Sequence, residues 1–385
     1  MKLQTVDVLA AGDALEITWS DGSRARFHAL WLRDNALDAE TRSTVNGQRL
    51  ITLLDISPDA SVAEASISPA GDLNVVIAPE MKALDFAGDW LKRHAYDQMQ
   101  TREAGSLDPA MTTWGSDLQD QVPTGTWDHI SQSPAALRDW LAGVREYGLA
   151  VLHGVPIRSG ALCDVAELFG FVRETNYGRW FEVRSEVNPE NLAYTNLGLQ
   201  AHTDNPYRDP VPTLQLLGCL ENTVEGGESI VVDGFNVARR LKSEDPGAFD
   251  LLGKYSATFE YAGAEGVRLR ADKQIIGLAP DGELKSISFN NRSAAPITSV
   301  PYDDMAAYYA ACRKFAELVE DKSMQVSFKL EPGELFIVDN TRVMHARQEF
   351  SGSGQRWLQG CYADMDALLS TLSILEDSQN IGDVA

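Results

Sequence analysis

The N-terminal part of the chain alternates apolar and polar positions with the period of β-strands. Residues 14–32, ALEITWSDGSRARFHALWL, alternate on both sides of Asp21-Gly22, a dipeptide typical of the turn in a β-hairpin. Residues 72–82, DLNVVIAPEMK, form a further strand candidate, and residues 86–97, FAGDWLKRHAYD, indicate a short helix. The pattern therefore predicts a small, β-rich domain over residues 1–97.

Residues 98–122 carry little periodicity, and we expect them to link the small domain to a larger one over residues 123–385. The larger domain begins with a helix signal, because Ser133 can cap a helix whose first position is Pro134. The apolar face of this helix comprises Leu137, Trp140, Leu141 and Val144. Gly148 is placed to end the helix, and the segment LAVLHGVP then predicts a strand.

Short apolar segments dominate the chain after residue 190. The strand candidates are TLQLLGCLE (213–221), ESIVVDGF (228–235), SISFNN (286–291), QVSFKL (325–330) and ELFIVDN (334–340). One amphipathic helix, residues 303–322, interrupts them. Many short strands separated by Gly and Pro turns are typical of a double-sheet barrel. We therefore predict a mainly β protein with flanking helices (α+β), in which a double-stranded β-helix, or jelly-roll, domain follows the small N-terminal domain.

Composition and charge narrow the classes of partner. The chain has 385 residues, of which 44% are hydrophobic, and a formal net charge of −23. A surface this acidic repels phosphate backbones, so nucleic acid is not an expected partner. No apolar run approaches the ~18 residues that a membrane span needs, so we expect no membrane association and a cytoplasmic location. The four cysteines form no CxxC pair, so a cysteine zinc site is not expected.

The segment QAHTDNPY, residues 200–207, holds the first candidate for chemistry. His202 and Asp204 are two residues apart, so in an extended segment their side chains point the same way. A third ligand is suggested by His345, which follows an apolar strand and a short loop, as a side chain at the mouth of a barrel would. Arg356 comes eleven residues later, on what we expect to be the next strand.

Two histidines and one carboxylate form the facial triad of non-haem iron(II) oxygenases, which leaves coordination positions open. We expect these positions to take a bidentate 2-oxo acid and then dioxygen. The distal carboxylate of 2-oxoglutarate needs a buried cation, and the planar fork of arginine suits it. The set predicts a dioxygenase that uses iron(II), 2-oxoglutarate and dioxygen, with ascorbate helpful in vitro. A non-catalytic binding protein of the cupin kind is one alternative, and an N-terminal domain that mainly recruits a partner is another.

Longer segments around these residues resemble the γ-butyrobetaine dioxygenase family, within the TauD-like iron(II)/2-oxoglutarate oxygenases. The matching segments are WLRDN (31–35), DWLKRHAYD (89–97), NLAYTN (191–196), GGESIVVDGFNV (226–237), DNTRVMHAR (339–347) and LQGCYADMD (358–366). The resemblance implies that His202, Asp204 and His345 are iron ligands. It also implies that Arg356 clamps 2-oxoglutarate, and it places Ser229 near that cosubstrate.

The family hydroxylates small substrates with a trimethylammonium head. Such a cation cannot donate a hydrogen bond, so aromatic faces hold it through cation–π attraction. The positions that match the family's cage are Tyr177, Phe181, Tyr194 and Tyr362, with Trp180 adjacent. Asn191 is a further expected substrate contact by the same resemblance. Taken singly, each aromatic residue could equally be part of the core, so the cage depends on the set.

The anionic tail of the substrate is less closely defined. In relatives the tail is the carboxylate of γ-butyrobetaine, the amino acid group of trimethyllysine, or a phosphonate. The segment SFNNRSAAP supplies Asn290, Asn291 and Arg292, and Tyr207 adds a phenol. Because an arginine, an amide and a phenol together suit three phosphonate oxygens, we predict 2-(trimethylammonio)ethylphosphonate, hydroxylated at the carbon bearing phosphorus. γ-Butyrobetaine, hydroxylated at C3 to carnitine, is the alternative, and a structural salt bridge for Arg292 stays open.

One departure from the family concerns the N-terminal domain. Many relatives bind structural zinc through a cysteine cluster directly after WLRDN, and here the next residues are ALDAETRSTVNGQ. Without those cysteines we predict no zinc, and we expect the domain to serve in packing and dimerisation. The resemblance also implies a homodimer.

Overall fold

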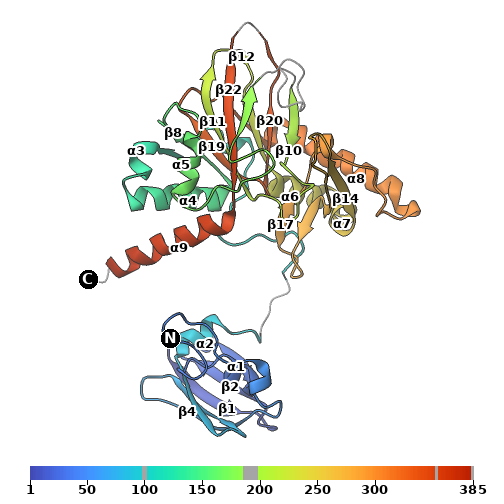
Figure 1. The fold of residues 1–385 in the computed structure, drawn as a ribbon. Helices are drawn as coiled ribbons and strands as arrows, with labels where there is room; N and C mark the ends of the chain where they lie inside the picture. The colour runs from blue at the N-terminus through green and yellow to red at the C-terminus, as the bar shows by residue number, and fades with distance from the viewer. Residues whose placement is uncertain (98–101, 185–197, 352–353, 383–385) are drawn as a thin grey trace. The chain divides into compact units, whose positions relative to one another are not determined.

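The computed structural model describes residues 1–97, 102–184, 198–351 and 354–382 (Figure 1). The chain divides into two compact units, Met1–Thr101 and Arg102–Ala385. In the described part of the chain, no helix combines the length and the apolar character needed to cross a membrane.

The first unit is built from two antiparallel, three-stranded sheets. The sheets comprise β1 (Leu3–Val8), β2 (Ala14–Trp19) and β3 (Arg24–His28), and β4 (Ser61–Ile67), β5 (Leu73–Ala78) and β6 (Lys82–Phe86). The helices are α1 (Ala29–Asp34), η1 (Leu53–Asp55) and α2 (Gly88–Arg93). Apolar side chains from both sheets and from α1 and α2 form one core. The indole of Trp19 lies in this core and donates to the carbonyl of Gly88 over 2.9 Å.

The local predictions for this unit have mixed outcomes. The hairpin around Asp21-Gly22 is confirmed, because β2 and β3 pair there and Gly22 adopts φ +82°. The strand predicted over residues 72–82 is in fact β5 followed by the first residue of β6. A turn at residues 79–81 separates them, since the Pro79 ring carries no amide hydrogen for a continuous ladder. The helix predicted over residues 86–97 is the shorter α2.

Two sheets carry the second unit. The six-stranded sheet comprises β7 (Thr124–Thr126), β8 (Leu149–His153), β19 (Leu335–Asp339), β11 (Leu214–Asn222), β22 (Arg356–Ala363) and β9 (Phe181–Arg184), in this spatial order. The four-stranded sheet comprises β10 (Leu199–His202), β20 (Val343–Arg347), β13 (Ser229–Asp233) and β18 (Gln325–Phe328). Apolar side chains of both sheets meet in one cluster, among them Val231, Val338 and Leu358. The two sheets therefore pack face to face, and the jelly-roll prediction is confirmed.

Three smaller β-pairs complete the unit. They are β12 (Glu225–Gly226) with β21 (Phe350–Ser351), β14 (Ser256–Tyr261) with β15 (Leu269–Gln274), and β16 (Ile276–Leu278) with β17 (Leu284–Ile287). The short helices are η2 (Ser116–Leu118), η4 (Asn291–Ser293) and η5 (Lys322–Met324).

Helices cover the outer face of each sheet. The helices are α3 (Trp127–Ile130), α4 (Pro134–Tyr147), α5 (Ala161–Glu167), α6 (Gly234–Glu244), α7 (Pro246–Lys254), α8 (Tyr302–Glu320) and α9 (Met365–Gly382). Helices α4, α5 and α9 pack on the six-stranded sheet, and α6, α7 and α8 gather on the side of the four-stranded sheet (Figure 1). The face of each sheet that points away from the other sheet is thus buried under helices.

Helix α4 forms as the sequence predicts. The Ser133 hydroxyl accepts from the amide of Ala136, Pro134 occupies the first turn, and Gly148 ends the helix with φ +69°. Trp140, Leu141 and Val144 are buried on its inner face. Capping at both ends and one apolar face therefore suffice to fix this helix.

The predicted linker is shorter than expected, because residues after 101 belong to the second unit. Trp114 is buried, and its indole donates to the carbonyl of Tyr147 over 2.7 Å. Its amide donates to Asp233 over 3.1 Å. Hydrogen bonds and burial thus hold a segment whose lack of periodicity suggested a free connection. The predicted strand over residues 286–291 also stops early, at Ile287, because the Asn290 side chain caps η4.

Candidate active site

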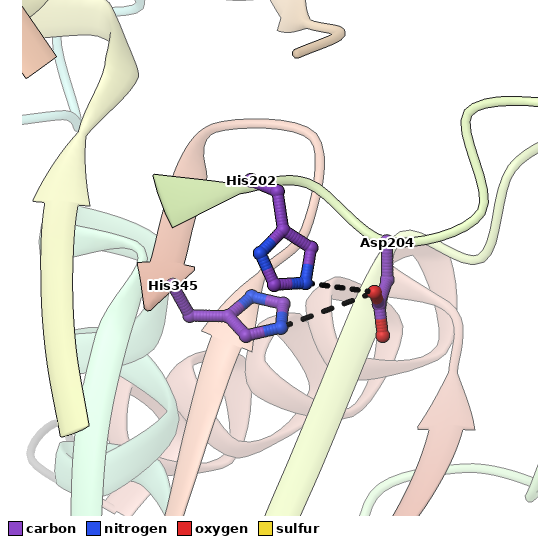
Figure 2. A group of neighbouring side chains, drawn as sticks. All are labelled: His202, Asp204 and His345. Carbon is purple, nitrogen blue, oxygen red and sulfur yellow. Dashed lines mark ion pairs between the residues drawn. The ribbon is translucent and has the colours of Figure 1, made fainter. Parts of the chain in front are cut away.

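The two candidate histidines face each other across paired strands. His202 is the last residue of β10, and its Cα partner in the antiparallel pair with β20 is His345. Partners in such a pair project from the same face of the sheet, and the ring centroids lie 4.4 Å apart. Asp204 lies two residues beyond His202 and turns its carboxylate toward both rings (Figure 2).

The three side chains bring their ligand atoms close together. Asp204 Oδ1 lies 3.3 Å from His202 Nε2 and 4.0 Å from His345 Nε2 (Figure 2). All the candidate ligand atoms lie within 4.8 Å of one another, and the described residues contain no second group of His, Cys, Asp or Glu side chains this close together. Ligands about 2.0–2.2 Å from one metal ion lie roughly 3–4 Å apart, so the donor set fits a single ion.

Hydrogen bonds orient two of these side chains. His202 Nδ1 donates to the carbonyl of Gln200 over 2.8 Å, so Nε2 is the ring nitrogen that faces the other two side chains. Asp204 Oδ2 accepts from Gln215 Nε2 over 2.8 Å and from the Tyr362 hydroxyl over 2.9 Å. The remaining oxygen, Oδ1, is therefore the one that faces the histidines.

The backbone and the charge of Asp204 are also fixed. Asn340 Oδ1 accepts from the Asp204 amide over 2.6 Å, and Asn340 Nδ2 donates to the Asp204 carbonyl over 2.9 Å. Burial opposes ionisation, yet the neighbouring His202, His345 and Arg292 hold the pKa of Asp204 below its usual value. The sequence analysis missed Gln215 and Asn340. Gln215 could have been noticed as the single polar residue within the otherwise apolar strand LQLLG.

Two buried arginines mark a place for an anion. Arg356 begins β22, and Arg347 ends β20, where its Cα partner is Ser229 of β13. Arg356 is only 8% exposed and Arg347 only 6%. Burial lowers the pKa of each to about 10, so both keep their charge at neutral pH. Buried cations are stable when an anion joins them, which fits a carboxylate ligand. Arg347 was not predicted, although its spacing from His345 places both on one face of β20.

A glycine packs closely against Phe350, beside Arg356. Gly227 adopts φ +73°, and a Cβ there would lie 3.2 Å from Phe350 Cβ and 3.5 Å from Arg356 Nε. Phe350 in turn lies beside both guanidinium groups, with its ring centroid 5.1 Å from Arg347 Cζ and 5.8 Å from Arg356 Cζ. Gly227 therefore leaves room for the Phe350 side chain beside the two arginines.

One cavity joins the triad, the arginines and a group of aromatic residues. Its lining comprises Tyr177, Phe181, Val183, Leu199, His202, Asp204, Asn205, Tyr207, Gln215, Leu217, Ser229, Arg292, Phe336, His345, Ala346, Arg347, Arg356 and Tyr362. Among the aromatic residues, the Phe181 centroid lies 5.2 Å from that of Tyr362 and 6.0 Å from that of Tyr177. Three of the four predicted cage residues are thus neighbours in this cavity.

A chain of hydroxyl groups fixes one wall of the cavity. The Tyr207 hydroxyl donates to Asn205 Oδ1 over 2.7 Å, and it lies 2.9 Å from the Tyr177 hydroxyl. Because the single proton of Tyr207 goes to Asn205, the Tyr177 hydroxyl is the donor in the other bond. Asn205 adopts φ +54° and is buried, and its Nδ2 has no hydrogen-bond partner among the described atoms. Asn205 is a further lining residue that the sequence analysis did not single out.

The predicted tail contacts do not gather at one point. Arg292 lines the cavity, and its Nη2 lies 2.5 Å from His202 Nε2. Asn291 instead lines a neighbouring hollow, and its Nδ2 donates to Gln200 Oε1 over 3.1 Å. Asn290 is occupied as the cap of η4. Only Arg292 of this segment therefore lines the cavity that holds the triad.

Three further residues were expected at the substrate site. Tyr194 and Asn191 fall outside the described residues. Trp180 is 37% exposed and is not a lining residue of the central cavity, because its ring lies over Gly160 at the start of α5. Trp180 is therefore not a cage residue in this structure.

Comparisons with known proteins agree with this architecture. The model of the taurine catabolism dioxygenase TauD, TfdA family matches residues 107–362, and the model of gamma-butyrobetaine hydroxylase-like N-terminal domains matches residues 6–78. A gamma-butyrobetaine dioxygenase of Pseudomonas sp. (strain AK-1) is 36% identical over 94% of each chain. The human gamma-butyrobetaine dioxygenase is 30% identical over 97% of each chain. A trimethyllysine dioxygenase of Meyerozyma guilliermondii is 28% identical over 96% of this chain and 94% of its own.

A solved structure supports the fold of the second unit. The crystal structure of an asparagine oxygenase superposes with a TM-score of 0.51 at 20% identity, over 61% of this chain and 80% of its own. The same enzyme, at a TM-score of 0.50, is known in complex with Fe(II), a hydroxyasparagine and succinate. The chain belongs to the γ-butyrobetaine dioxygenase family within the TauD/TfdA dioxygenases, and it is a dioxygenase that uses iron(II) and 2-oxoglutarate.

Proposed function

We propose that His202, Asp204 and His345 hold the iron and that Arg356 holds the distal carboxylate of 2-oxoglutarate, with Ser229 in the same cavity. Bound iron(II) supplies the redox chemistry that couples oxidative decarboxylation of 2-oxoglutarate to hydroxylation of a C–H bond. Asp204 presents Oδ1 to the metal because Gln215 and Tyr362 occupy Oδ2. The protein otherwise binds, orients and shields the reactants.

The Arg347 guanidinium extends the anion subsite. Arg347 is the Cα partner of Ser229 in the paired strands, and it lines the same cavity as Arg356. Two buried guanidinium groups suit a cosubstrate that carries two carboxylates, because each can meet an oxygen through a charge-assisted hydrogen bond. The role of Arg347 is therefore to share the negative charge of 2-oxoglutarate with Arg356.

The substrate head is a trimethylammonium group held by Tyr177, Phe181 and Tyr362. These rings are neighbours in one cavity with the triad, and burial raises the pKa of both phenols, so they stay neutral. Neutral aromatic faces attract a cation that cannot hydrogen-bond. The Tyr177 hydroxyl is held by Tyr207, which fixes how its ring faces the head.

The substrate proposed here is γ-butyrobetaine, hydroxylated at C3 to carnitine. One observation carries the choice of a carboxylate tail: of the three predicted tail contacts, only Arg292 brings a cationic side chain to the cavity. The Tyr207 proton is committed to Asn205, and Asn291 donates to Gln200 in a different hollow. One guanidinium matches the two oxygens of a carboxylate. The relatives at 36% and 30% identity, named gamma-butyrobetaine dioxygenases, support the same choice.

A second candidate is 2-(trimethylammonio)ethylphosphonate, which the sequence analysis placed first. The hydrogen bonds of Tyr207 to Asn205 and of Asn291 to Gln200 argue against two of the three donors on which that prediction was based. Asn205 Nδ2 is the observation in its favour, since this buried donor lines the cavity without a described partner and could meet a third oxygen. The phosphonate therefore remains the comparison substrate in each test of the tail.

The Arg292→Ala variant tests the tail assignment. We expect the KM for γ-butyrobetaine to rise roughly 10–100-fold, since a hydrogen-bonded charge pair is lost, while the KM for 2-oxoglutarate stays within about twofold. Arg270→Ala is the matched control. It removes an exposed arginine of β15 that pairs with Glu260, and it should leave both constants unchanged. An unchanged KM for γ-butyrobetaine in Arg292→Ala would remove Arg292 from the tail subsite.

A further inference from the structure

The position of Phe181 depends on a glycine in the neighbouring strand. Gly360 of β22 and Phe181 of β9 are Cα partners, so a side chain at either position would project from the same face of the sheet. Tyr362 lies two residues further along β22 and therefore shares this face. Both Phe181 and Tyr362 line the central cavity, so the shared face is the one that lines that cavity.

The Phe181 ring fills the space that a side chain at position 360 would need. A Cβ built on Gly360 would lie 2.5 Å from Phe181 Cε2, and it would come closer still to Cζ. Real Cβ atoms essentially never approach another atom this closely, so the ring lies directly over the glycine. The Phe181 side chain thus reaches across β22 at Gly360. Its ring centroid lies 5.2 Å from that of Tyr362, with the rings tilted by 32°.

We propose that Gly360 is a specificity-determining position. Because Gly360 has no side chain, the Phe181 ring can lie close to the sheet, and this position of the ring sets how large an ammonium head fits the cage. The proposal rests on the proposed trimethylammonium substrate and names the residue that positions one cage wall. Gly360 touches Phe181 rather than substrate, so it is a positioning residue.

The direction of the steric effect follows from the shared face. A methyl group at position 360 points toward the cavity and pushes the Phe181 ring away from the sheet. The ring then takes up part of the space that it bounds together with Tyr177 and Tyr362. A quaternary ammonium head is the bulkiest ammonium group, so it loses the most room. A smaller head, such as that of the dimethylamino analogue of the substrate, loses less. Gly360→Ala therefore shifts selectivity away from the trimethylammonium head.

Direct binding of tetramethylammonium chloride measures the cage without tail, cosubstrate or turnover. We would determine its dissociation constant by isothermal titration calorimetry for the wild type, Gly360→Ala, Phe181→Leu and the double variant. Gly360→Ala should weaken binding roughly tenfold, within the range of a desolvated cation–π contact. In the Phe181→Leu background the same glycine substitution should change binding less than about twofold, because the ring that transmits the effect is gone.

Gly218→Ala is the matched control. Gly218 lies on β11 in the same six-stranded sheet, and a Cβ there would meet nothing closer than 3.6 Å. It should bind tetramethylammonium as the wild type does. If Gly360→Ala does not fold, the double variant still tests the proposal, because leucine at 181 has no ring over residue 360. A double variant that also fails to fold would assign Gly360 another structural role and overturn the proposal.

The outcomes separate this inference from the proposed substrate. Equal tetramethylammonium binding by the wild type and Gly360→Ala, or additive effects in the double variant, would overturn the role of Gly360. No binding by the wild type would overturn it as well, since no cage would exist to be set. Hydroxylation of γ-butyrobetaine is measured separately, and its absence alongside a Gly360-dependent tetramethylammonium site would reject the carboxylate tail and leave the cage in place.

Discussion

The two ends of the central cavity are built in different ways. The proposed iron and cosubstrate residues His345, Arg347, Arg356 and Ser229 stand on paired strands of the two sheets. The candidate tail residues Arg292, Asn205 and Tyr207 stand instead on η4 and on the loop after β10. Backbone ladders fix the first group, whereas side-chain hydrogen bonds fix the second.

This difference explains why the reaction class is easier to assign than the substrate. A strand residue has its direction set by register, so His202 and His345 converge wherever β10 and β20 pair as they do here. A loop residue can change its partner with one neighbouring substitution. Loops on a fixed scaffold are where substrate choice varies, so the tail subsite is where members of one family would differ.

The largest effect should follow from removing the charge of Asp204, a proposed metal ligand on the loop after β10 whose carboxylate Gln215 and Tyr362 hold in place. Asp204→Asn keeps the shape of the side chain but replaces a carboxylate that iron(II) requires. We expect turnover to fall well beyond the ~10–100-fold typical of residues that only support a ligand. Asp209→Asn, a nearby exposed aspartate, is the control. Iron content and succinate formation are measured together, and wild-type iron content with full turnover would contradict the ligand assignment.

The cosubstrate clamp should show a smaller, separable effect. Arg356→Ala removes a buried cation, so the KM for 2-oxoglutarate should rise roughly 10–100-fold. Arg356→Lys restores charge without the planar fork and should recover only part of the loss. The KM for the trimethylammonium substrate should change little. A rise confined to that substrate would mean that the arginine serves the other end of the cavity.

The smallest effect is expected on the loop side, at Tyr207. Its hydroxyl is engaged with Asn205 and Tyr177, so Tyr207→Phe should raise the KM for γ-butyrobetaine less than about threefold. The lost internal hydrogen bond should cost about 1 kcal/mol of stability, visible as a small fall in Tm. A KM increase of tenfold or more, above all for the phosphonate, would return Tyr207 to the tail subsite.

The sequence predicts residues whose roles follow from local spacing. Ser133, Pro134 and Gly148 define α4 because capping and φ preferences act within one turn. His202 and Asp204 are recognisable for the same reason, since their separation fixes a common direction in an extended segment.

Roles that depend on distant pairing were not predictable. Gln215 and Asn340 orient Asp204 only because β11 and the turn after β19 lie beside it in the folded chain. Asn291 directly precedes Arg292, yet the η4 turn directs it to another hollow. Segment 102–122 shows the same limit, because Trp114 is held by long-range hydrogen bonds that no periodicity reveals.

The most direct test of the central claim is a competition between the two candidate substrates. The purified protein would receive iron(II), ascorbate, 2-oxoglutarate and equimolar γ-butyrobetaine and 2-(trimethylammonio)ethylphosphonate, and mass spectrometry would follow which one gains an oxygen atom. The account predicts that carnitine forms first and in step with succinate. A hydroxylated phosphonate formed ahead of carnitine, or succinate with neither product, would contradict it.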